Sequence, residues 1–247
     1  MKAMIFAAGL GSRLKPLTDL TPKALLPVAG KPMLEHLILK LKAAGFDRLV
    51  INIHHHGEQI IDFLKQHDDF GIDILISDER DYLLDTGGGI KKAAAFLQGD
   101  EPFLVHNVDV FSDADLGALY RAHNAQNAIA TLLVNRRETS RYLLFNEANR
   151  LCGWRNKATG EIKSYYPDFN PELYTEYAFS GIHMLSPQIF DWLEEWTGRF
   201  SIISFYLSIA ARTTIQAYPV PELKMLDIGK PETLERAGKF LKEIGQR

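Results

Sequence analysis

The chain has 247 residues, 46% of them hydrophobic and 24% charged, and its 28 Lys and Arg against 31 Asp and Glu give a formal net charge of −3. These fractions exclude a disordered, collagen-like or coiled-coil protein, and the lack of a basic excess argues against a nucleic-acid partner. No apolar run reaches the roughly 18 residues of a membrane span, and the N-terminal segment is a poor signal peptide. The single cysteine, Cys152, suits a reducing compartment. We therefore expect a cytoplasmic protein without a membrane partner.

Short apolar runs alternate with segments of helical periodicity through the first half of the chain. Such alternation is typical of βαβ units, because strands buried on both faces of a parallel sheet are uniformly apolar. The expected strands are 2–8, 48–54, 72–77, 102–107 and 129–134, and the expected helices are 32–45, 57–66, 87–97 and 113–123, the last capped by Ser112 or Asp113. The pattern predicts an α/β fold with a doubly wound, mainly parallel sheet.

The pattern changes after Arg141. Two short β-like pieces, 142–146 and 151–155, precede a polar, aromatic stretch that we interpret as a small antiparallel β insertion or lid. Whether the tyrosines from Tyr165 to Tyr177 pack on the domain or contact a second subunit is left open. Helices at 186–195 and 202–211, strands at 215–218 and 225–228, and a last helix from Pro231 follow. No Gly-, Ser- or Pro-rich linker appears, so we expect a single domain over 1–247.

The loop after the first strand carries the strongest functional signal. In Ala7-Ala8-Gly9-Leu10-Gly11-Ser12-Arg13, two glycines allow backbone N–H groups to approach a phosphate, and Arg13 adds a planar set of donors. Lys23 supplies a second cation ten residues later. A dinucleotide fingerprint is excluded because its third glycine would fall on Leu14, and no Gly-Lys-Ser/Thr of a P-loop follows. The loop therefore indicates phosphate binding at a strand end.

Several motifs in this order together resemble one enzyme family. The run AAGLGSRLKPLT…TPKALLPVAGKP, followed by LDTGGG (84–89), NVD (107–109), FSG (179–181) and LDIG (226–229), resembles the sugar-1-phosphate nucleotidylyltransferases. The LDTGGG and FSGI segments are most similar to the short N-acetylmuramate-1-phosphate uridylyltransferases. This resemblance implies a Rossmann-like nucleotidyltransferase fold, with a nucleotide-binding half at 1–140 and a sugar-phosphate-binding half with a lid at 141–247. No room remains for the hexapeptide-repeat β-helix of bifunctional relatives, so acetyl transfer is not expected.

The resemblance also implies the chemistry and the residues that perform it. A sugar 1-phosphate oxygen attacks the α-phosphorus of a nucleoside triphosphate, and pyrophosphate leaves without a covalent enzyme intermediate. The implied catalytic residues are Arg13 and Lys23, and the implied Mg²⁺ ligands are Asp109 and Asp227. The implied nucleotide-binding residues are Ala7, Ala8, Gly9, Gly11, Asp85, Thr86 and Gly88, and those for the sugar phosphate are Asn107, Ser180 and Gly181. Val108 departs from the glycine of many relatives and could crowd the substrates.

The substrates themselves stay open at this point. The first choice is UTP with N-acetylmuramic acid 1-phosphate, followed by GTP with mannose 1-phosphate or a heptose 1-phosphate. A non-catalytic nucleotide-sugar-binding regulatory protein is an alternative, although the intact charged residues argue against it. A phosphocholine cytidylyltransferase is a third alternative, because the tyrosine-rich stretch could form an aromatic cage. The chain is expected to be a monomer or a homodimer.

Two further features receive ordinary interpretations. His54, His55 and His56 cannot all face one ion from a regular strand, because successive side chains alternate. We interpret them as a structural or substrate-adjacent loop rather than a metal site, and Cys152 as a packed small side chain.

Overall fold

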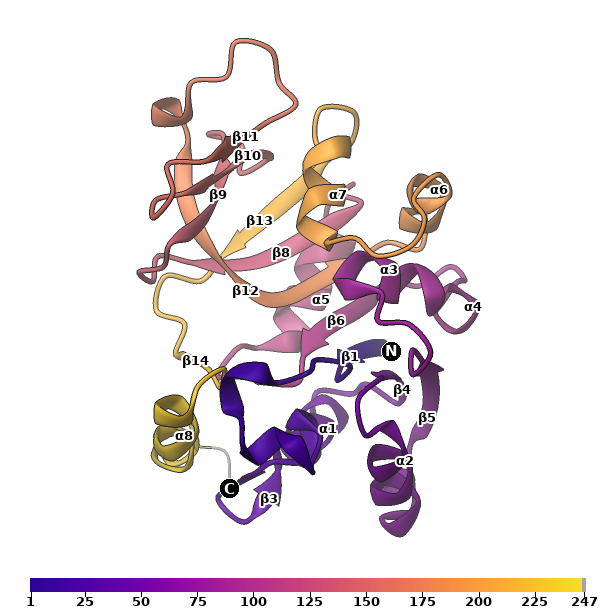
Figure 1. Ribbon diagram of the computed structural model, residues 1–247. Coiled ribbons are helices and arrows are strands. Elements are labelled where there is room, and N and C mark those ends of the chain that lie inside the picture. The colour runs from indigo at the N-terminus through magenta and orange to yellow at the C-terminus, as the bar shows by residue number, and fades with distance from the viewer. Residues whose placement is uncertain (246–247) are drawn as a thin grey trace.

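A mixed sheet of ten strands forms the centre of the computed structural model, which describes residues 1–245 (Figure 1). Its strands are β1 (Lys2–Phe6), β4 (Arg48–Ile53), β5 (Asp73–Asp78), β6 (Phe103–Asn107), β8 (Ala130–Asn135), β9 (Arg141–Phe145), β10 (Leu151–Asn156), β11 (Ile162–Lys163), β12 (Thr175–Leu185) and β13 (Ile215–Pro219). Two small sheets pair β2 (Pro27–Val28) with β3 (Lys31–Pro32), and β7 (Val110–Ser112) with β14 (Met225–Asp227). The helices are α1 (Met33–Ala43), α2 (Gly57–Gln66), α3 (Asp85–Lys92), α4 (Ala94–Leu97), α5 (Leu116–Asn124), α6 (Ile189–Leu193), α7 (Ile202–Ile209) and α8 (Pro231–Glu243).

The N-terminal half contributes four parallel strands in the order β6-β1-β4-β5. Met4 in β1 lies between Val50 of β4 and Val105 of β6. The chain leaves β1 to one side for β4 and β5, and later returns to the other side for β6. In open α/β sheets, ligands bind in the crevice where the strand order reverses in this way. The predicted α/β, mainly parallel fold is confirmed, and its switch point lies between β1 and β6.

The antiparallel part is organised by β12, an 11-residue strand that the sequence patterns do not predict. It pairs antiparallel with β6, β8 and β9, and its register against β8 shifts between Phe179 and His183. β9, β10 and β11 continue this antiparallel ladder, while β13 runs parallel to β8. The predicted small antiparallel insertion is therefore present, and β12 joins it to the parallel strands.

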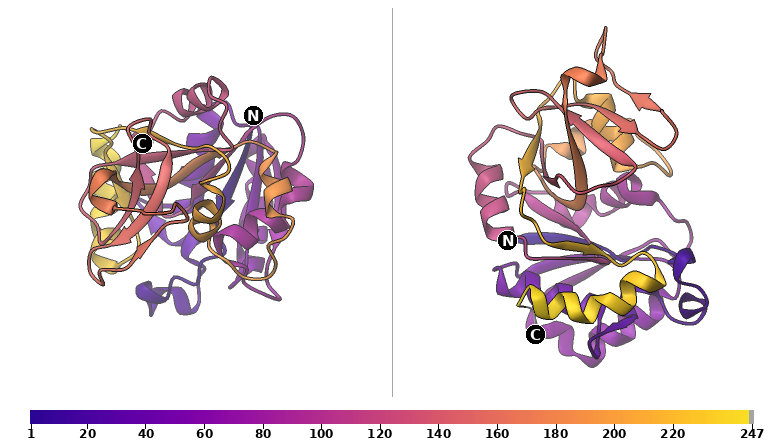
Figure 2. Two further views of the ribbon diagram at one scale, coloured as in Figure 1. Left: turned by 90° about the horizontal axis from the view of Figure 1, so that it is seen from above. Right: turned by 90° about the vertical axis from the view of Figure 1, so that its left-hand side faces the viewer.

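Helices cover both faces of the sheet because successive side chains of its strands point in opposite directions. Ala3 and Ile5 of β1 belong to a core with buried leucines of α1, α2 and α5. Met4, between them, belongs to the opposite core with α3, α4, α6 and α7. The views in Figures 1 and 2 show helices on the two faces and α8 crossing the N-terminal half.

The end of the chain closes a third cluster beside the N-terminal loop. Ala237 and Leu241 of α8 pack with Ile228 and with Leu14, which lies in the glycine loop. This packing fixes the loop after β1 against the segment after β14. The site is thus assembled from both ends of the chain.

Most element predictions agree with the structure, and the exceptions have local reasons. The helix expected at 57–66 has those bounds, whereas the helix expected at 87–97 begins at Asp85 and is divided into α3 and α4. The cap predicted at Ser112 or Asp113 was wrong, because Asp115 caps α5 by accepting from the Ala118 N–H at 2.8 Å, and 110–112 forms β7. Over residues 1–245, no helix combines the length and apolarity needed to cross a membrane. The division at residue 140 stays a prediction.

Candidate active site

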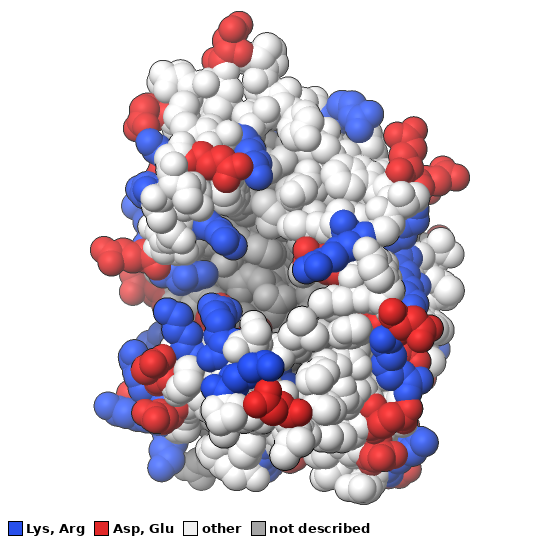
Figure 3. All heavy atoms as spheres, in the orientation of Figure 1, with Lys and Arg blue, Asp and Glu red and all other residues white. Residues whose placement is uncertain are grey.

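A cavity of about 340 Å³ opens at the ends of β1 and β6, within the usual size range of small-ligand sites. In Figure 3 the molecule is hollowed between its two halves, with Lys and Arg side chains on both sides of the hollow. The predicted residues among its lining are Ala7, Ala8, Gly9, Gly11, Arg13, Lys23, Asp85, Thr86, Asn107 and Asp109. Residues that are distant in sequence therefore meet at the predicted edge of the sheet.

The glycine loop has the tight turn that its sequence suggests. Gly11 has φ +62°, and a Cβ there would lie 2.7 Å from Cγ2 of Thr18. The Gly11 carbonyl accepts from the Thr18 hydroxyl at 3.0 Å and from the Leu14 N–H at 2.8 Å. Leu14 is fully buried. Arg13, its neighbour, therefore starts from a fixed backbone and lines the cavity.

Three charged side chains meet beside this loop. Lys23, which is only 8% exposed, forms an ion pair with Asp109 at the end of β6. The Asp109 carbonyl accepts from the Ile228 N–H at 2.8 Å, and Asp227 pairs with Val110 between β14 and β7. Asp227 is not part of the cavity lining itself, whereas the nearby Gly229 is. The structure thus brings the two predicted metal-binding aspartates together at the rim of the cavity, although the sequence separates them widely.

The electrostatic environment of Asp227 reflects this crowding. Partial desolvation, followed by the nearby Asp109 carboxylate, raises its pKa, while the cations Lys23, Arg13 and Arg137 oppose that rise. A Cβ added to Gly229 would lie 2.7 Å from Nη2 of Arg13 and 3.1 Å from Oδ1 of Asp227. Gly229 therefore leaves the space in which the Arg13 guanidinium approaches Asp227.

Two adjacent carboxylates fit a divalent cation, and the cation would offset the effect by which the Asp109 carboxylate raises the pKa of Asp227. Asp109 and Asp227 would hold it. Within residues 1–245, no group of three or more His, Cys, Asp and Glu converges on one point. The protein would therefore supply two carboxylates and leave the other positions to phosphate oxygens and water, as Mg²⁺ commonly requires.

The segment Asp85–Gly89 begins a helix two residues earlier than the sequence predicts. It forms the first residues of α3, and its three glycines pack against protein. Added Cβ atoms would lie 2.3 Å from the Phe200 ring at Gly87, 2.6 Å from the Gly198 oxygen at Gly88 and 2.9 Å from Glu79 Oε1 at Gly89. Gly88 is absent from the cavity lining, and its contact with the nucleotide stays a prediction.

Asp85 and Thr86, in contrast, do line the cavity. Asp85 has a left-handed backbone with φ +61°, and its Oδ1 accepts from the Thr86 N–H at 2.6 Å. The Thr86 hydroxyl accepts from the Ile202 N–H at 2.9 Å. The start of α3 is thereby fixed to the start of α7 beside the cavity.

The predicted sugar-phosphate residues are separated by the structure. Asn107 lines the cavity, but Ser180 and Gly181 do not. The Ser180 hydroxyl donates to the Leu133 carbonyl at 2.7 Å and accepts from the Ile182 N–H at 3.2 Å. These contacts lie where β12 changes register, so Ser180 stabilises a bulge. Gly181, at φ +80°, makes room for the Asn107 side chain, whose Nδ2 lies 2.5 Å from the position of an added Cβ.

Further lining residues were not among the predicted site residues. Val108 was singled out only for its departure from glycine; it lines the cavity, and its side chain is buried in the core that contains Ala3 and Ile5 of β1. Arg199 reaches the cavity because the following Phe200 N–H donates to the Leu84 carbonyl at 3.2 Å. Two buried polar residues, Asn52 on β4 and Glu79 after β5, belong to no sequence motif. They lie beside the same cavity because β4 pairs with β5. The other lining residues that were not predicted are Phe6, Ser12, Asn52, Glu79, Leu83 and Gly229.

The histidine run stabilises loops around the site. A ring nitrogen of His54 lies 2.7 Å from the Glu79 carbonyl, and one of His56 lies 3.0 Å from the Asp19 carbonyl. Cys152 is buried, as expected for a packed side chain, and burial raises the pKa of its thiol.

The aromatic stretch packs on the antiparallel part. The Tyr166 hydroxyl donates to the Ala210 carbonyl at 2.8 Å, and Phe169 stacks on Tyr174 with ring centroids 4.6 Å apart. Tyr165 remains 61% exposed. Whether this stretch acts as a lid or as a subunit contact stays a prediction.

Comparison with known proteins gives a consistent result. A family model described as nucleotidyl transferase matches residues 2–244. An N-acetylmuramate alpha-1-phosphate uridylyltransferase of Neisseria meningitidis is 38% identical over 78% of this chain and 79% of its own length. One of the same description from Caulobacter vibrioides is 32% identical over 93% and 92%. The inositol-1-phosphate CTP transferase of T. maritima shares the fold, with a TM-score of 0.77, 18% identity and coverage of 98% of this chain and 95% of that one.

Proposed function

The chain belongs to the nucleotidyl transferase family and is a sugar-1-phosphate nucleotidylyltransferase, and we propose that its substrates are UTP and N-acetylmuramic acid 1-phosphate. The cavity at the switch point carries this proposal, because Arg13, Lys23 and Asp109 line it and Asp227 lies at their side, from the other end of the chain. Two bacterial relatives named for this uridylyl transfer support the choice of substrates.

The proposed reaction is one displacement at phosphorus. An oxygen of the sugar 1-phosphate forms a bond to the α-phosphorus of UTP, the bond from that phosphorus to the bridging oxygen breaks, and pyrophosphate leaves. Both reactants are anionic, so the main tasks of the protein are to position them and to offset their repulsion.

The cations are placed for these tasks. Arg13 lies on the glycine loop and would bind the β- and γ-phosphates, where negative charge grows as pyrophosphate leaves. Lys23, held against Asp109, would lie between the reacting phosphates. A Mg²⁺ ion bound by Asp109 and Asp227 would neutralise phosphate charge in the transition state.

The remaining residues would orient the substrates. Backbone N–H groups from Gly9 to Gly11 would bind the triphosphate, and Ala7 and Ala8 would line the nucleotide site with their own N–H groups held by Asn52. Asp85 and Thr86 would lie beside the base. Asn107 would contact the sugar phosphate, with Gly181 behind it. We further propose that the enzyme acts in the cytoplasm, as a monomer or a homodimer.

A pyrophosphate-release screen tests this proposal. The four common nucleoside triphosphates are combined with N-acetylmuramic acid, mannose, heptose and glucose 1-phosphates in the presence of Mg²⁺. Highest kcat/KM for UTP with N-acetylmuramic acid 1-phosphate is expected. Preference for GTP with mannose 1-phosphate would overturn the substrate assignment, and release with no pair would contradict the proposed catalysis.

A further inference from the structure

A buried pair of polar side chains, Asn52 and Glu79, lies at the base of the candidate active site. Asn52 is 3% exposed on β4, and Glu79 is 0% exposed directly after β5. Both line the cavity. Burying a carboxylate is costly unless its oxygens find partners, so its contacts indicate what the carboxylate stabilises.

The two side chains connect the two loops that face the nucleotide site. Glu79 Oε1 accepts from Asn52 Nδ2 at 2.7 Å, and Oε2 accepts from the Leu84 N–H at 3.0 Å. Asn52 Oδ1 accepts from the N–H groups of Ala7 at 2.8 Å and Ala8 at 3.3 Å. The chain of hydrogen bonds therefore runs from the glycine loop, across β4, to the residue that precedes Asp85.

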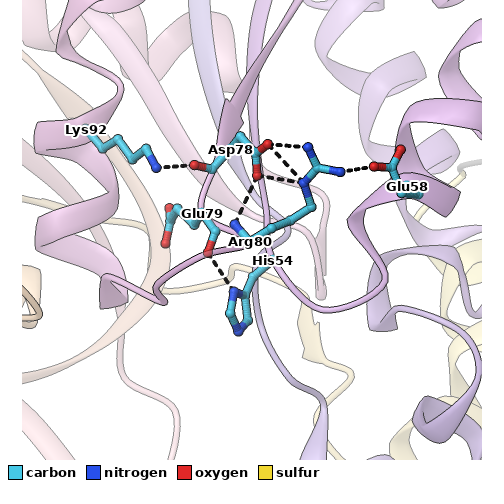
Figure 4. A network of polar contacts seen from close by, with 6 residues as sticks. All are labelled: His54, Glu58, Asp78, Glu79, Arg80 and Lys92. Carbon is cyan, nitrogen blue, oxygen red and sulfur yellow. Dashed lines mark hydrogen bonds and ion pairs between the residues drawn. The ribbon is translucent and has the colours of Figure 1, made fainter.

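The backbone of Glu79 is fixed from several directions. Its N–H donates to the Ile53 carbonyl at 2.8 Å, and its carbonyl lies 2.7 Å from a ring nitrogen of His54. Figure 4 shows that the neighbouring Arg80 turns instead toward Asp78 and away from the Glu79 carboxylate. Arg80 thus pairs with surface carboxylates and leaves the Glu79 carboxylate to the buried hydrogen bonds.

The space around the pair is also defined. A Cβ at Gly89 would lie 2.9 Å from Glu79 Oε1 and 3.2 Å from Asn52 Nδ2. The glycine in α3 therefore allows the carboxylate and the amide to meet. The hydrogen-bonded pair of Asn52 and Glu79 thus lies where three elements meet: β4, the loop after β5, and α3.

We propose that Asn52 and Glu79 are positioning residues that hold the backbone of Ala7 and Ala8, where the phosphate-binding loop begins, at a fixed distance from the base-side segment at Leu84 and Asp85. This inference rests on the proposed function, since it assigns those loops to the triphosphate and the base. The pair acts through the loops and needs no contact of its own with the reacting atoms.

Exchanging the amide of Asn52 and the carboxylate of Glu79 between the two positions tests this proposal, because an amide and a carboxylate differ in the hydrogen bonds that they donate and accept. In Glu79→Gln, the new amide can accept from only one of its two donors, Asn52 Nδ2 and the Leu84 N–H, and meets the other with its own NH₂, so one hydrogen bond is lost. In Asn52→Asp, two carboxylates face each other across the broken bond. In the double variant, the new carboxylate at position 52 accepts from the loop N–H groups and from the new amide at position 79. The oxygen of that amide accepts from the Leu84 N–H, so every bond and the net charge are restored.

The expected kinetic result is reciprocal rescue. Each single variant is expected to lower kcat/KM for the nucleoside triphosphate by about 10- to 100-fold, the scale associated with small misplacements of substrate. The KM for the sugar 1-phosphate is expected to change little. The double variant is expected to recover most of the loss. Asp78→Asn, which alters the adjacent surface carboxylate, serves as the matched control and is expected to retain wild-type kinetics.

Urea unfolding of the wild type, the two single variants and the double variant separates this inference from the proposed function, because it needs no substrate. Lower stability of both single variants and recovery in the double variant would establish the hydrogen-bonded coupling even if no substrate pair released pyrophosphate. Recovery of stability without recovery of kcat/KM in an active enzyme would overturn the positioning role, because the Glu79 carboxylate would then act on the substrate directly. Additive losses of stability would overturn the coupling itself.

Discussion

At the scale of single residues, the site depends on charged side chains whose positions are fixed by buried neighbours and by an ion pair. Arg13 extends from a loop whose adjacent Leu14 is buried, and Lys23 is fixed by Asp109. Partial desolvation and the Asp109 carboxylate raise the pKa of Asp227. The raised pKa of Asp227 reflects a cost of ionisation that a bound cation would offset, which indicates a binding role for this carboxylate rather than a contribution to folding.

Arg13→Ala is expected to lower kcat by about 10²- to 10³-fold, because it removes donors from developing charge on the leaving group. Initial rates of pyrophosphate release measure the effect, and circular dichroism checks the fold. Lys15→Ala removes an exposed cation of the same loop that pairs with Asp19 at 3.1 Å, and should leave kcat unchanged. Equal rates for both variants would remove Arg13 from the triphosphate site.

Asp227→Asn is expected to raise the Mg²⁺ concentration for half-maximal activity by about 10- to 100-fold, since one of two carboxylate ligands is lost. Magnesium titration of the initial rate measures this shift. Glu222→Gln, an exposed carboxylate just before β14, is the control. A titration curve for Asp227→Asn that overlays the wild-type curve would show that Asp227 is not a ligand.

At the scale of elements, the glycines of α3 allow neighbouring segments to pack closely against the helix. The central strands β6 and β12 bury histidine side chains. Gly87 in α3 faces the Phe200 ring, whereas Gly238 in α8 has only Ala29 atoms near, at 3.8 Å or beyond. His106 in β6 and His183 in β12 are both almost completely buried. These features lead to two stability predictions.

Gly87→Ala is expected to destabilise the fold by about 1–3 kcal/mol, because the new methyl group overlaps Phe200. Gly238→Ala is expected to stabilise it by about 0.5–1 kcal/mol, because alanine favours the helix and meets no close atom. Urea unfolding of both variants measures the difference. Stabilisation by both substitutions would show that α3 does not pack against Phe200 as described.

Acid is expected to destabilise the protein through its buried histidines. Burial lowers the pKa of His106 and His183 to about 3, and that of His123 to about 4. Their folded pKa values lie below the unfolded value of about 6.5, so the unfolded chain gains protons first as the pH falls below about 6.5. Their contribution to stability is therefore full above about pH 6.5 and declines as the pH falls to the folded pKa values, about 4 for His123 and about 3 for His106 and His183.

Each of these histidines should contribute about 1 kcal/mol to the loss between about pH 6 and about pH 5. Urea unfolding at the two pH values measures the loss. His106→Leu removes one such titration, so its loss should be smaller than that of the wild type by this amount. Identical pH dependence in the two proteins would contradict a neutral, buried His106.

At the scale of the whole molecule, the sequence predicts the parallel sheet well because its strands are uniform apolar runs between clear helices. β12 escapes prediction because Ser180 and Gly181 interrupt its pattern at the bulge. The motif residues of the cavity are found through the family resemblance, since Asp109 and Asp227 meet only through the pairing of β7 with β14.

Other parts of the site depend on tertiary contacts that no local pattern encodes. Asn52 and Glu79 come from different parts of the sheet, and neither carries a motif of its own. Gly88 in α3 was predicted to bind the nucleotide; the structure shows in addition that Gly87, Gly88 and Gly89 leave room for neighbouring protein atoms. The sequence shows that the start of α3 is rich in glycine, and only the packing in the folded protein shows which atoms require the glycines.

The most direct test of the whole account is the position of bound metal and nucleotide. A crystal of the protein soaked with Mn²⁺ and a non-hydrolysable UTP analogue would give an anomalous peak at the metal. The account predicts a peak within coordination distance of the Asp109 and Asp227 carboxylates, with the triphosphate along the Ala7–Gly11 backbone and near Arg13. A nucleotide bound outside this cavity, or a peak that neither carboxylate contacts, would contradict it.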